Sequence, residues 1–132
     1  MKVLFVCSGN AHRSPLAEAL LKKARPDWAV DSAGISVSIP IAEQVKRYLA
    51  KESAEAYLKS FPEALATKKV GSYDLVVAME QKHRNYVLAA YPDCVDRVVV
   101  WNIEDPYFMS PEEAEKIYNR IKEKVQQLAG SM

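Results

Sequence analysis

Short apolar segments alternate with segments of helical spacing along the whole chain, and this alternation restricts the chain to one fold class. Residues Lys2 to Cys7 form an apolar run that stops at Ser8-Gly9-Asn10, which is typical of a strand buried on both faces. Ser14 and Pro15 then predict the start of a helix, with Ser14 as its N-cap. Further strands are expected over residues 28–32, 73–79 and 97–101, and further helices over residues 41–61 (broken near residues 52–53), 80–91 and 110–128. We therefore expect an α/β fold with a parallel sheet, whose ligands bind beyond the carboxyl ends of the strands.

The length and composition are those of an ordinary globular domain. The 132 residues are 49% hydrophobic and 27% charged, so we expect a single domain over residues 1–132. Eighteen Lys and Arg against 17 Asp and Glu residues give a net charge of +1, so we expect neither nucleic acid nor a membrane as a partner. The apolar runs are too short for a membrane span or a signal peptide. Two cysteines, Cys7 and Cys94, are too few for a disulfide framework or a zinc site. We expect a reduced, cytoplasmic monomer without metal or cofactor.

The segment after the first expected strand carries the chemistry, and we call it the phosphate loop. It comprises Cys7, Ser8, Gly9, Asn10, Ala11, His12, Arg13 and Ser14. A loop of small residues that runs into a helix N-terminus turns backbone N–H groups inward, and these bind an anion at the positive end of the helix dipole. The planar guanidinium of Arg13 can bind two phosphate oxygens at once. The segment therefore predicts a site for a phosphoryl group.

Two further side chains complete the predicted chemistry. Cys7 lies at the base of this positive loop, which favours the thiolate, and a hydrogen bond from the Ser14 hydroxyl would add to that preference. A thiolate can attack phosphorus without a general base. Asp105 follows the last expected strand, so it can reach the same edge of the sheet, and Pro106 restricts its backbone. We expect Asp105 to protonate the leaving oxygen and later to take a proton from water.

Four segments, in this order, resemble the low-molecular-weight protein tyrosine phosphatases: VLFVCSGNAHRSPLAEALL, DSAGIS, YDLVVAME and EDPYF. The resemblance implies one three-layer domain, with a four-stranded parallel sheet flanked by helices and the phosphate loop after the first strand. It also implies a metal-independent phosphomonoesterase that forms a cysteinyl-phosphate intermediate. Its substrate would be a phosphorylated protein or a small phosphomonoester.

The same resemblance assigns roles to individual residues. It makes Cys7 the nucleophile, Arg13 the phosphate-binding arginine and Asp105 the general acid. The remaining assignments are loop-shaping and thiolate-stabilising roles for Asn10 and Ser14, a supporting hydroxyl for Ser32, and an aromatic pair flanking the pocket for Tyr107 and Phe108.

The chain departs from the family pattern in the phosphate loop. His12 stands where family members often carry a second cysteine that protects the nucleophile from over-oxidation. We expect His12 to point outward, the alternative being that it adds positive charge near Cys7. Cys94 is expected to be a packing residue, so the protection is absent unless the fold brings the two cysteines together.

Three other departures concern substrate choice and the support of the loop. Ala11 replaces the isoleucine of tyrosine-specific members and the threonine of an arginine-phosphate-specific branch, so the substrate stays open. Residues 35–41 lack the aromatic side chain usual in the family, which leaves recognition mainly to the aromatic pair of the Asp-Pro loop. Residues 50–70 lack the supporting histidine that the family often uses, so we expect the support of the loop to be rearranged there.

Three alternative functions remain at this point. An arsenate reductase on the same fold would need two further cysteines, and the chain has Cys94 alone. A cysteine phosphocarrier of the sugar-transport type would lack both Arg13 and Asp105. A module that binds phosphate without turnover fits the altered loop, although binding alone does not require Asp105.

Overall fold

The apolar run at the start of the chain forms strand β1 (Lys2–Cys7), which lies inside the sheet. The computed structural model describes residues 1–131. In it, β1 pairs in parallel with β2 (Ala29–Gly34) on one side and with β3 (Leu75–Ala78) on the other. Residues Val3 to Val6 are fully buried, because a strand between two neighbours and two helical layers has no face exposed to water.

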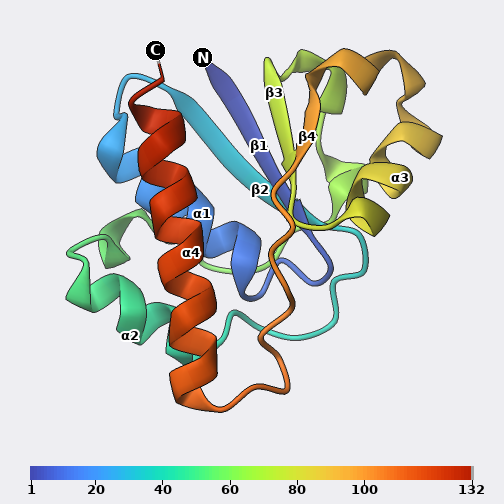
Figure 1. The fold of residues 1–132 in the computed structure, drawn as a ribbon. Helices are drawn as coiled ribbons and strands as arrows, with labels where there is room; N and C mark the ends of the chain where they lie inside the picture. The colour runs from blue at the N-terminus through green and yellow to red at the C-terminus, as the bar shows by residue number, and fades with distance from the viewer. Residues whose placement is uncertain (132) are drawn as a thin grey trace.

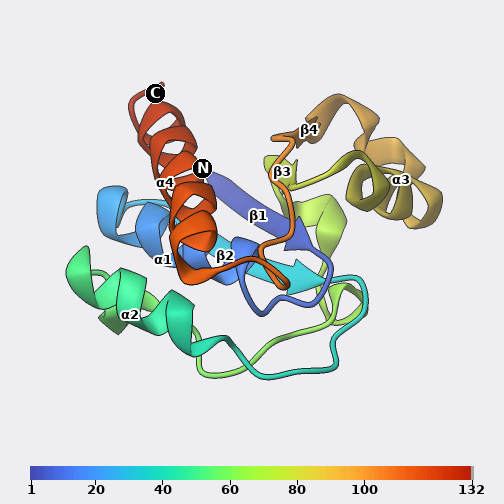
Figure 2. The ribbon, with the colours of Figure 1, turned by 60° about the horizontal axis from the view of Figure 1, so that its bottom comes forward.

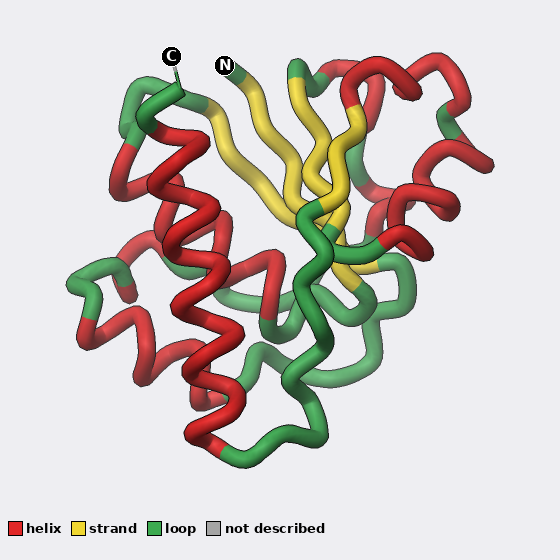
Figure 3. Tube along the Cα trace, viewed as in Figure 1, coloured by secondary structure: helices red, strands yellow, loops and turns green. Residues whose placement is uncertain are grey.

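The four strands form one parallel sheet with the order β2-β1-β3-β4, in which β4 spans Val98–Val100. This confirms the predicted fold class. The main helices are α1 (Arg13–Ala24), α2 (Glu43–Lys51), α3 (Gln81–Ala90) and α4 (Pro111–Ala129). Short 3₁₀ helices span Glu55–Tyr57, Leu65–Thr67, Val70–Ser72 and Pro92–Arg97. Figure 3 shows how the strands converge on the loops at their carboxyl ends.

Helices cover the sheet on both faces, so the molecule has three layers (Figures 1 and 2). Helices α1 and α4 pack on one face, where the core includes Phe5 and Ile121. Helix α3 and the nearby 3₁₀ segments cover the other face, where the core includes Val6 and Val87. Within residues 1–131, no helix is long and apolar enough to cross a bilayer.

The strands shift from their expected bounds by at most two residues, and the larger differences concern two helices. Helix α1 begins at Arg13, two residues earlier than expected. Ser14 is therefore not its N-cap, and its hydroxyl is bonded to the side chains of Cys7 and Asn10 instead. The helix expected over residues 41–61 ends at Lys51. The break is where it was expected: Ser53 adopts a left-handed conformation with φ 56°, and the chain then continues as a single 3₁₀ turn and loops rather than as a helix. The helix expected over residues 110–128 is α4, and its N-cap is Ser110, whose hydroxyl accepts a hydrogen bond from the Glu113 amide.

The end of β2 lies directly against the phosphate loop. Gly34 pairs with Cys7 across the ladder. A Cβ atom at Gly34 would lie 2.8 Å from each of three backbone atoms, namely Asn10 N, Gly9 C and Ser8 O. Real Cβ atoms do not approach backbone this closely, so the absence of a side chain at Gly34 is what lets the loop pack on β2.

We therefore predict that Gly34→Ala displaces the phosphate loop and destabilises the fold by about 1–3 kcal/mol. Gly71→Ala is the matched control, because a Cβ atom there meets nothing within 4 Å. Urea unfolding of the two variants and the wild type measures the difference. Equal stability of Gly34→Ala and Gly71→Ala would contradict the packing argument.

Candidate active site

A pocket of about 300 Å³ opens at the carboxyl ends of the strands, where the fold class predicts a ligand. Three segments build it: the phosphate loop after β1, the loop after β2 and the loop after β4. Its lining residues are Cys7, Ser8, Gly9, Ala11, His12, Arg13, Ser36, Ser38, Ile39, Asp105 and Tyr107. Asn10, Ser14 and Ser32 are fully buried and do not line the pocket, so they can act on it only through other residues.

Cys7 ends β1 and is the buried thiol of the pocket. Its Sγ lies 2.8 Å from Ser14 Oγ, which belongs to the first turn of α1. The Ser14 hydroxyl accepts a hydrogen bond from Asn10 Nδ2 at 2.7 Å, so its own proton is free to be donated to the sulfur. A hydroxyl that donates to sulfur stabilises a thiolate more than a thiol.

Arg13 is 1% exposed, and the protein fixes one end of its guanidinium. Nη1 donates to Ile103 O at 2.7 Å and to the Glu80 carboxylate. Nη2 lies 3.6 Å from Asp105 Oδ2 and 3.5 Å from Ser8 Oγ. The two acceptors of Nη1 hold the guanidinium in the wall of the pocket, while Nη2 faces the side chains that line it.

Asp105 lies on the loop after β4, and its side chain is 44% exposed. Its Oδ1 accepts a hydrogen bond from the Tyr107 amide at 3.0 Å, which fixes the carboxyl group within the Asp-Pro-Tyr turn. The second oxygen, Oδ2, faces Arg13. One oxygen therefore orients the side chain, and the other is directed into the pocket.

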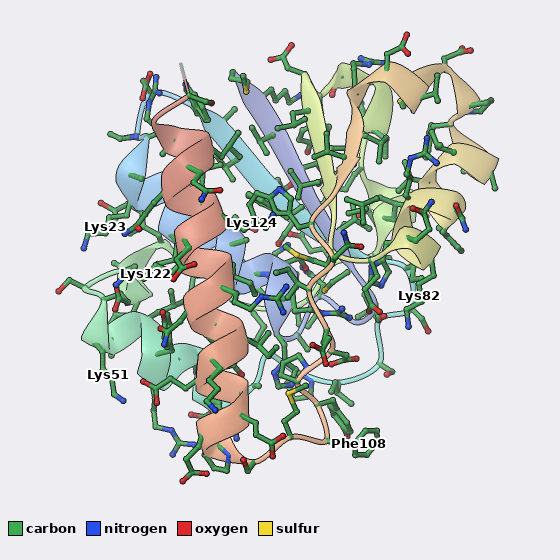
Figure 4. The ribbon with its side chains drawn as sticks, in the orientation of Figure 1. Lys23, Lys51, Lys82, Phe108, Lys122 and Lys124 are labelled. Carbon is green, nitrogen blue, oxygen red and sulfur yellow. The ribbon has the colours of Figure 1, made fainter. Side chains whose placement is uncertain are left out.

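The expected aromatic pair is divided between the pocket and the solvent. Tyr107 lines the pocket, and its ring stands edge-on to that of Phe108 with the centroids 4.7 Å apart. Phe108 is not a lining residue; it is 95% exposed and projects from the surface (Figure 4). The expectation that both rings flank the pocket therefore needs correction for Phe108, because its ring touches Tyr107 and is otherwise surrounded by solvent.

Asn10 holds the phosphate loop from behind. Its backbone is left-handed, with φ 54°, and its side chain is fully buried. The amide oxygen accepts hydrogen bonds from the Glu63 amide and Lys59 Nζ, and the amide nitrogen donates to the hydroxyls of Ser14 and Ser32. All four hydrogen bonds available to the side chain are made, which fixes both its position and the identity of its two ends.

Comparison with known proteins now identifies the family. The family model described as low molecular weight phosphotyrosine protein phosphatase matches residues 2–132. The chain belongs to this family. It is 30% identical over 136 residues to the low molecular weight protein-tyrosine-phosphatase Etp of Escherichia coli, with 96% of this chain and 91% of Etp covered. Curated relatives of this kind are protein tyrosine phosphatases, so the chain is a phosphatase of the cysteine-dependent, low-molecular-weight class.

Solved structures give the same fold. The structure of Vibrio vulnificus Wzb in complex with benzylphosphonate matches with a TM-score of 0.89 at 26% identity, covering 99% of this chain and 98% of Wzb. The YwlE arginine phosphatase from Geobacillus stearothermophilus matches with a TM-score of 0.86 at 26% identity, covering 97% of this chain and 90% of YwlE. The fold is therefore shared by phosphatases that are named for different phosphorylated residues.

In this phosphatase a lysine from the segment between α2 and β3 supports the phosphate loop. Lys59 is 8% exposed, and its Nζ donates to Asn10 Oδ1 at 3.0 Å and to Ser32 O at 2.8 Å. It also pairs with Glu63 at 2.8 Å and lies 3.8 Å from the buried Glu18. The sequence analysis expected a rearranged support here but did not single out Lys59. Nothing in the local sequence distinguishes Lys59 from the other lysines of residues 50–70.

The N-terminus of α3 supplies a second group of residues that the sequence analysis did not single out. Glu80 and His83 cap the helix reciprocally, because the Glu80 side chain accepts from the His83 amide and His83 Nδ1 accepts from the Glu80 amide at 3.0 Å. Glu80 also binds Arg13, and His83 Nε2 lies 2.9 Å from Ser8 Oγ. Burial lowers the pKa of His83 to about 4, with the nearby Arg13 charge acting in the same direction, so the ring is neutral at neutral pH.

His12 does not point outward as expected. It is half-buried and lines the pocket, with Nδ1 3.2 Å from the Tyr118 hydroxyl and its ring edge-on to Tyr107. Burial lowers the pKa of His12, which disfavours the alternative of an added positive charge near Cys7. The ring packs inward because α4 brings the Tyr118 hydroxyl within hydrogen-bond distance.

The Lys59 contacts generate a test. We predict that Lys59→Met destabilises the fold by about 2 kcal/mol, because Asn10 Oδ1 and Ser32 O each lose a donor and the buried Glu18 keeps only Lys22 as its cation. Because Asn10 also holds Ser14, alkylation of Cys7 by iodoacetamide should slow at neutral pH. The control is Lys116→Met, an exposed lysine on α4. If both variants react with iodoacetamide like the wild type, Lys59 supports only stability and not the thiol.

Proposed function

We propose that this phosphatase hydrolyses phosphate monoesters with Cys7 as nucleophile, Arg13 as the phosphate-binding residue and Asp105 as the general acid. The observation that carries the proposal is the meeting of these three side chains in one pocket, with Ser14 Oγ 2.8 Å from Cys7 Sγ. The free edge of the Arg13 guanidinium and the backbone N–H groups of the phosphate loop would hold the equatorial oxygens of the phosphoryl group.

Two steps complete the reaction. In the first, Cys7 Sγ bonds to phosphorus, the bond from phosphorus to the ester oxygen breaks, and protonated Asp105 gives its proton to that oxygen. In the second, the Asp105 carboxylate takes a proton from water, the water oxygen bonds to phosphorus, and the phosphorus–sulfur bond breaks. Inorganic phosphate leaves, and Cys7 returns to the thiolate while Asp105 keeps the proton.

The proposed substrate is a phosphorylated protein or a small phosphomonoester. Among these we favour phosphotyrosine, as for a protein tyrosine phosphatase. Tyr107 offers an apolar ring at the side of the pocket, as an aryl phosphate would require. Ala11 leaves room beside the phosphoryl site, and residues 35–41 contribute Ser36 and Ser38 to the lining but no aromatic side chain. Phosphotyrosine and phosphoarginine are therefore the two substrates to compare first.

The setting is proposed from the same features. A reactive Cys7 together with a second unpaired cysteine, Cys94, suits the reducing cytoplasm. The pairing of all four strands in one sheet supports the proposal of a single domain over residues 1–132. A monomer is the proposed state of the chain.

For the nucleophile, we predict that the wild type hydrolyses p-nitrophenyl phosphate with EDTA present. Cys7→Ser should lower kcat by at least about 10³-fold, because a hydroxyl at this position has no general base to activate it. The control, Cys94→Ser, should retain activity, since Cys94 packs on the other face of the sheet. Circular dichroism checks that both variants fold. An inactive, folded wild type would favour a phosphate-binding module instead, and activity that depends on a thioredoxin-type reductant and arsenate would favour the reductase.

A further prediction concerns the general acid. Asp105→Asn should slow phenyl phosphate about 10²-fold, because its leaving group needs a proton, and should slow p-nitrophenyl phosphate much less. Glu104→Gln, a change at the exposed neighbouring carboxylate, is the matched control. Steady-state kcat/KM values for both substrates provide the measurement. Equal slowing of the two esters by Asp105→Asn would remove Asp105 from the acid role.

A further inference from the structure

The side chain of Ser8 lies in the wall of the pocket and has two hydrogen-bond partners, both supplied by buried residues. Ser8 Oγ is 2.9 Å from His83 Nε2 and 3.5 Å from Arg13 Nη2. Whether Ser8 donates or accepts in these two hydrogen bonds determines whether its hydroxyl hydrogen is available to a ligand.

The His83 ring can only donate to Ser8. Its Nδ1 faces the backbone N–H of Glu80 at 3.0 Å, and an N–H group is always a donor, so Nδ1 carries no proton. A neutral ring must then carry its proton on Nε2, which is the atom that faces Ser8. His83 is fully buried, so no water competes for this proton.

Arg13 is also an obligatory donor, because a guanidinium has no acceptor atom. The two lone pairs of Ser8 Oγ therefore receive hydrogens from His83 and Arg13. Within residues 1–131, the hydrogen of the Ser8 hydroxyl has no acceptor of its own. Ser8 lines the same pocket as Arg13 and Cys7, so this hydrogen is available to a ligand there.

We propose that the Ser8 hydroxyl is a phosphoryl-oxygen donor of this site, and that His83 is the positioning residue that turns its hydrogen into the pocket. The inference rests on the proposed phosphatase site and adds a side-chain donor to it. The carboxyl end of β1 and the N-terminus of α3 thereby act on the same phosphoryl group, α3 through Glu80 on Arg13 and through His83 on Ser8.

The first test measures the binding of inorganic phosphate by titration calorimetry, which does not depend on turnover. Ser8→Ala removes the donor and should weaken phosphate binding about tenfold, as expected for one hydrogen bond to a charged group. Ser8→Thr keeps a hydroxyl at the same place and should bind phosphate within about twofold of the wild type. Wild-type affinity in Ser8→Ala would overturn the inference.

A matched pair of variants tests His83. In His83→Gln the amide nitrogen takes the place of Nε2 and can still donate to Ser8, whereas in His83→Asn the amide reaches only the place of Nδ1 and restores the helix cap alone. We expect His83→Asn to weaken phosphate binding about tenfold and to raise KM more than it lowers kcat, with His83→Gln close to the wild type. Thermal unfolding of both variants identifies any general loss of structure, in which case the Ser8 pair decides.

Non-additivity provides the last check. Because His83 acts through Ser8, the double variant Ser8→Ala/His83→Asn should bind phosphate no more weakly than Ser8→Ala alone. A further tenfold loss in the double variant would contradict the positioning role.

Measurements of turnover separate this inference from the proposed function. If the wild type is active and Ser8→Ala binds phosphate normally, only the Ser8 assignment is overturned. If the wild type is inactive but binds phosphate through Ser8, only the proposed turnover is overturned.

Discussion

The buried amide of Asn10 is the constraint on which the active site depends. A left-handed backbone costs a non-glycine residue roughly 1–2 kcal/mol, and Asn10 adopts it at full burial. Four hydrogen bonds offset this cost, two accepted from residues 59 and 63 and two donated to the hydroxyls of Ser14 and Ser32. The loop therefore has one shape before any ligand arrives, and a preorganised loop loses little entropy when it binds an anion.

The same hydrogen bonds determine which groups donate and which accept in the network from Lys59 to Cys7. Lys59 is an obligatory donor to Asn10 Oδ1, so the other end of the amide must donate, and Ser14 must in turn donate to Cys7. Ser32 accepts from Asn10 and donates to the buried Glu18 at 2.6 Å. The charge of Lys59 is thus balanced by carboxylates at one end of the network, and the sulfur receives a hydrogen bond at the other end.

The sequence was sufficient for the sheet and the phosphate loop because both are encoded locally. The run Lys2 to Cys7 and the residues just after it specify a buried strand, a turn and a helix start within a short stretch of chain. The position of Asp105 at the pocket could be predicted because parallel strands bring their carboxyl ends to one edge. Lys59 and His83 could not, because their partners Asn10 and Ser8 are 49 and 75 positions away and no local pattern encodes such contacts. The error at Ser14 has a different cause: its hydroxyl is bonded to Cys7 and Asn10 within the phosphate loop and does not cap the helix.

The placement of the two cysteines determines how this phosphatase would recover from oxidation. Cys7 belongs to the core on one face of the sheet and Cys94 to the core on the other, so the sheet separates the two thiols. His12 occupies the loop position at which a neighbouring thiol would be close enough to react. A sulfenic acid formed at Cys7 therefore has no resolving partner within residues 1–131, and its reduction needs a thiol from another molecule that is small enough to enter the pocket. The cellular thiol pool, and not an internal disulfide, would set how long an oxidised molecule stays inactive.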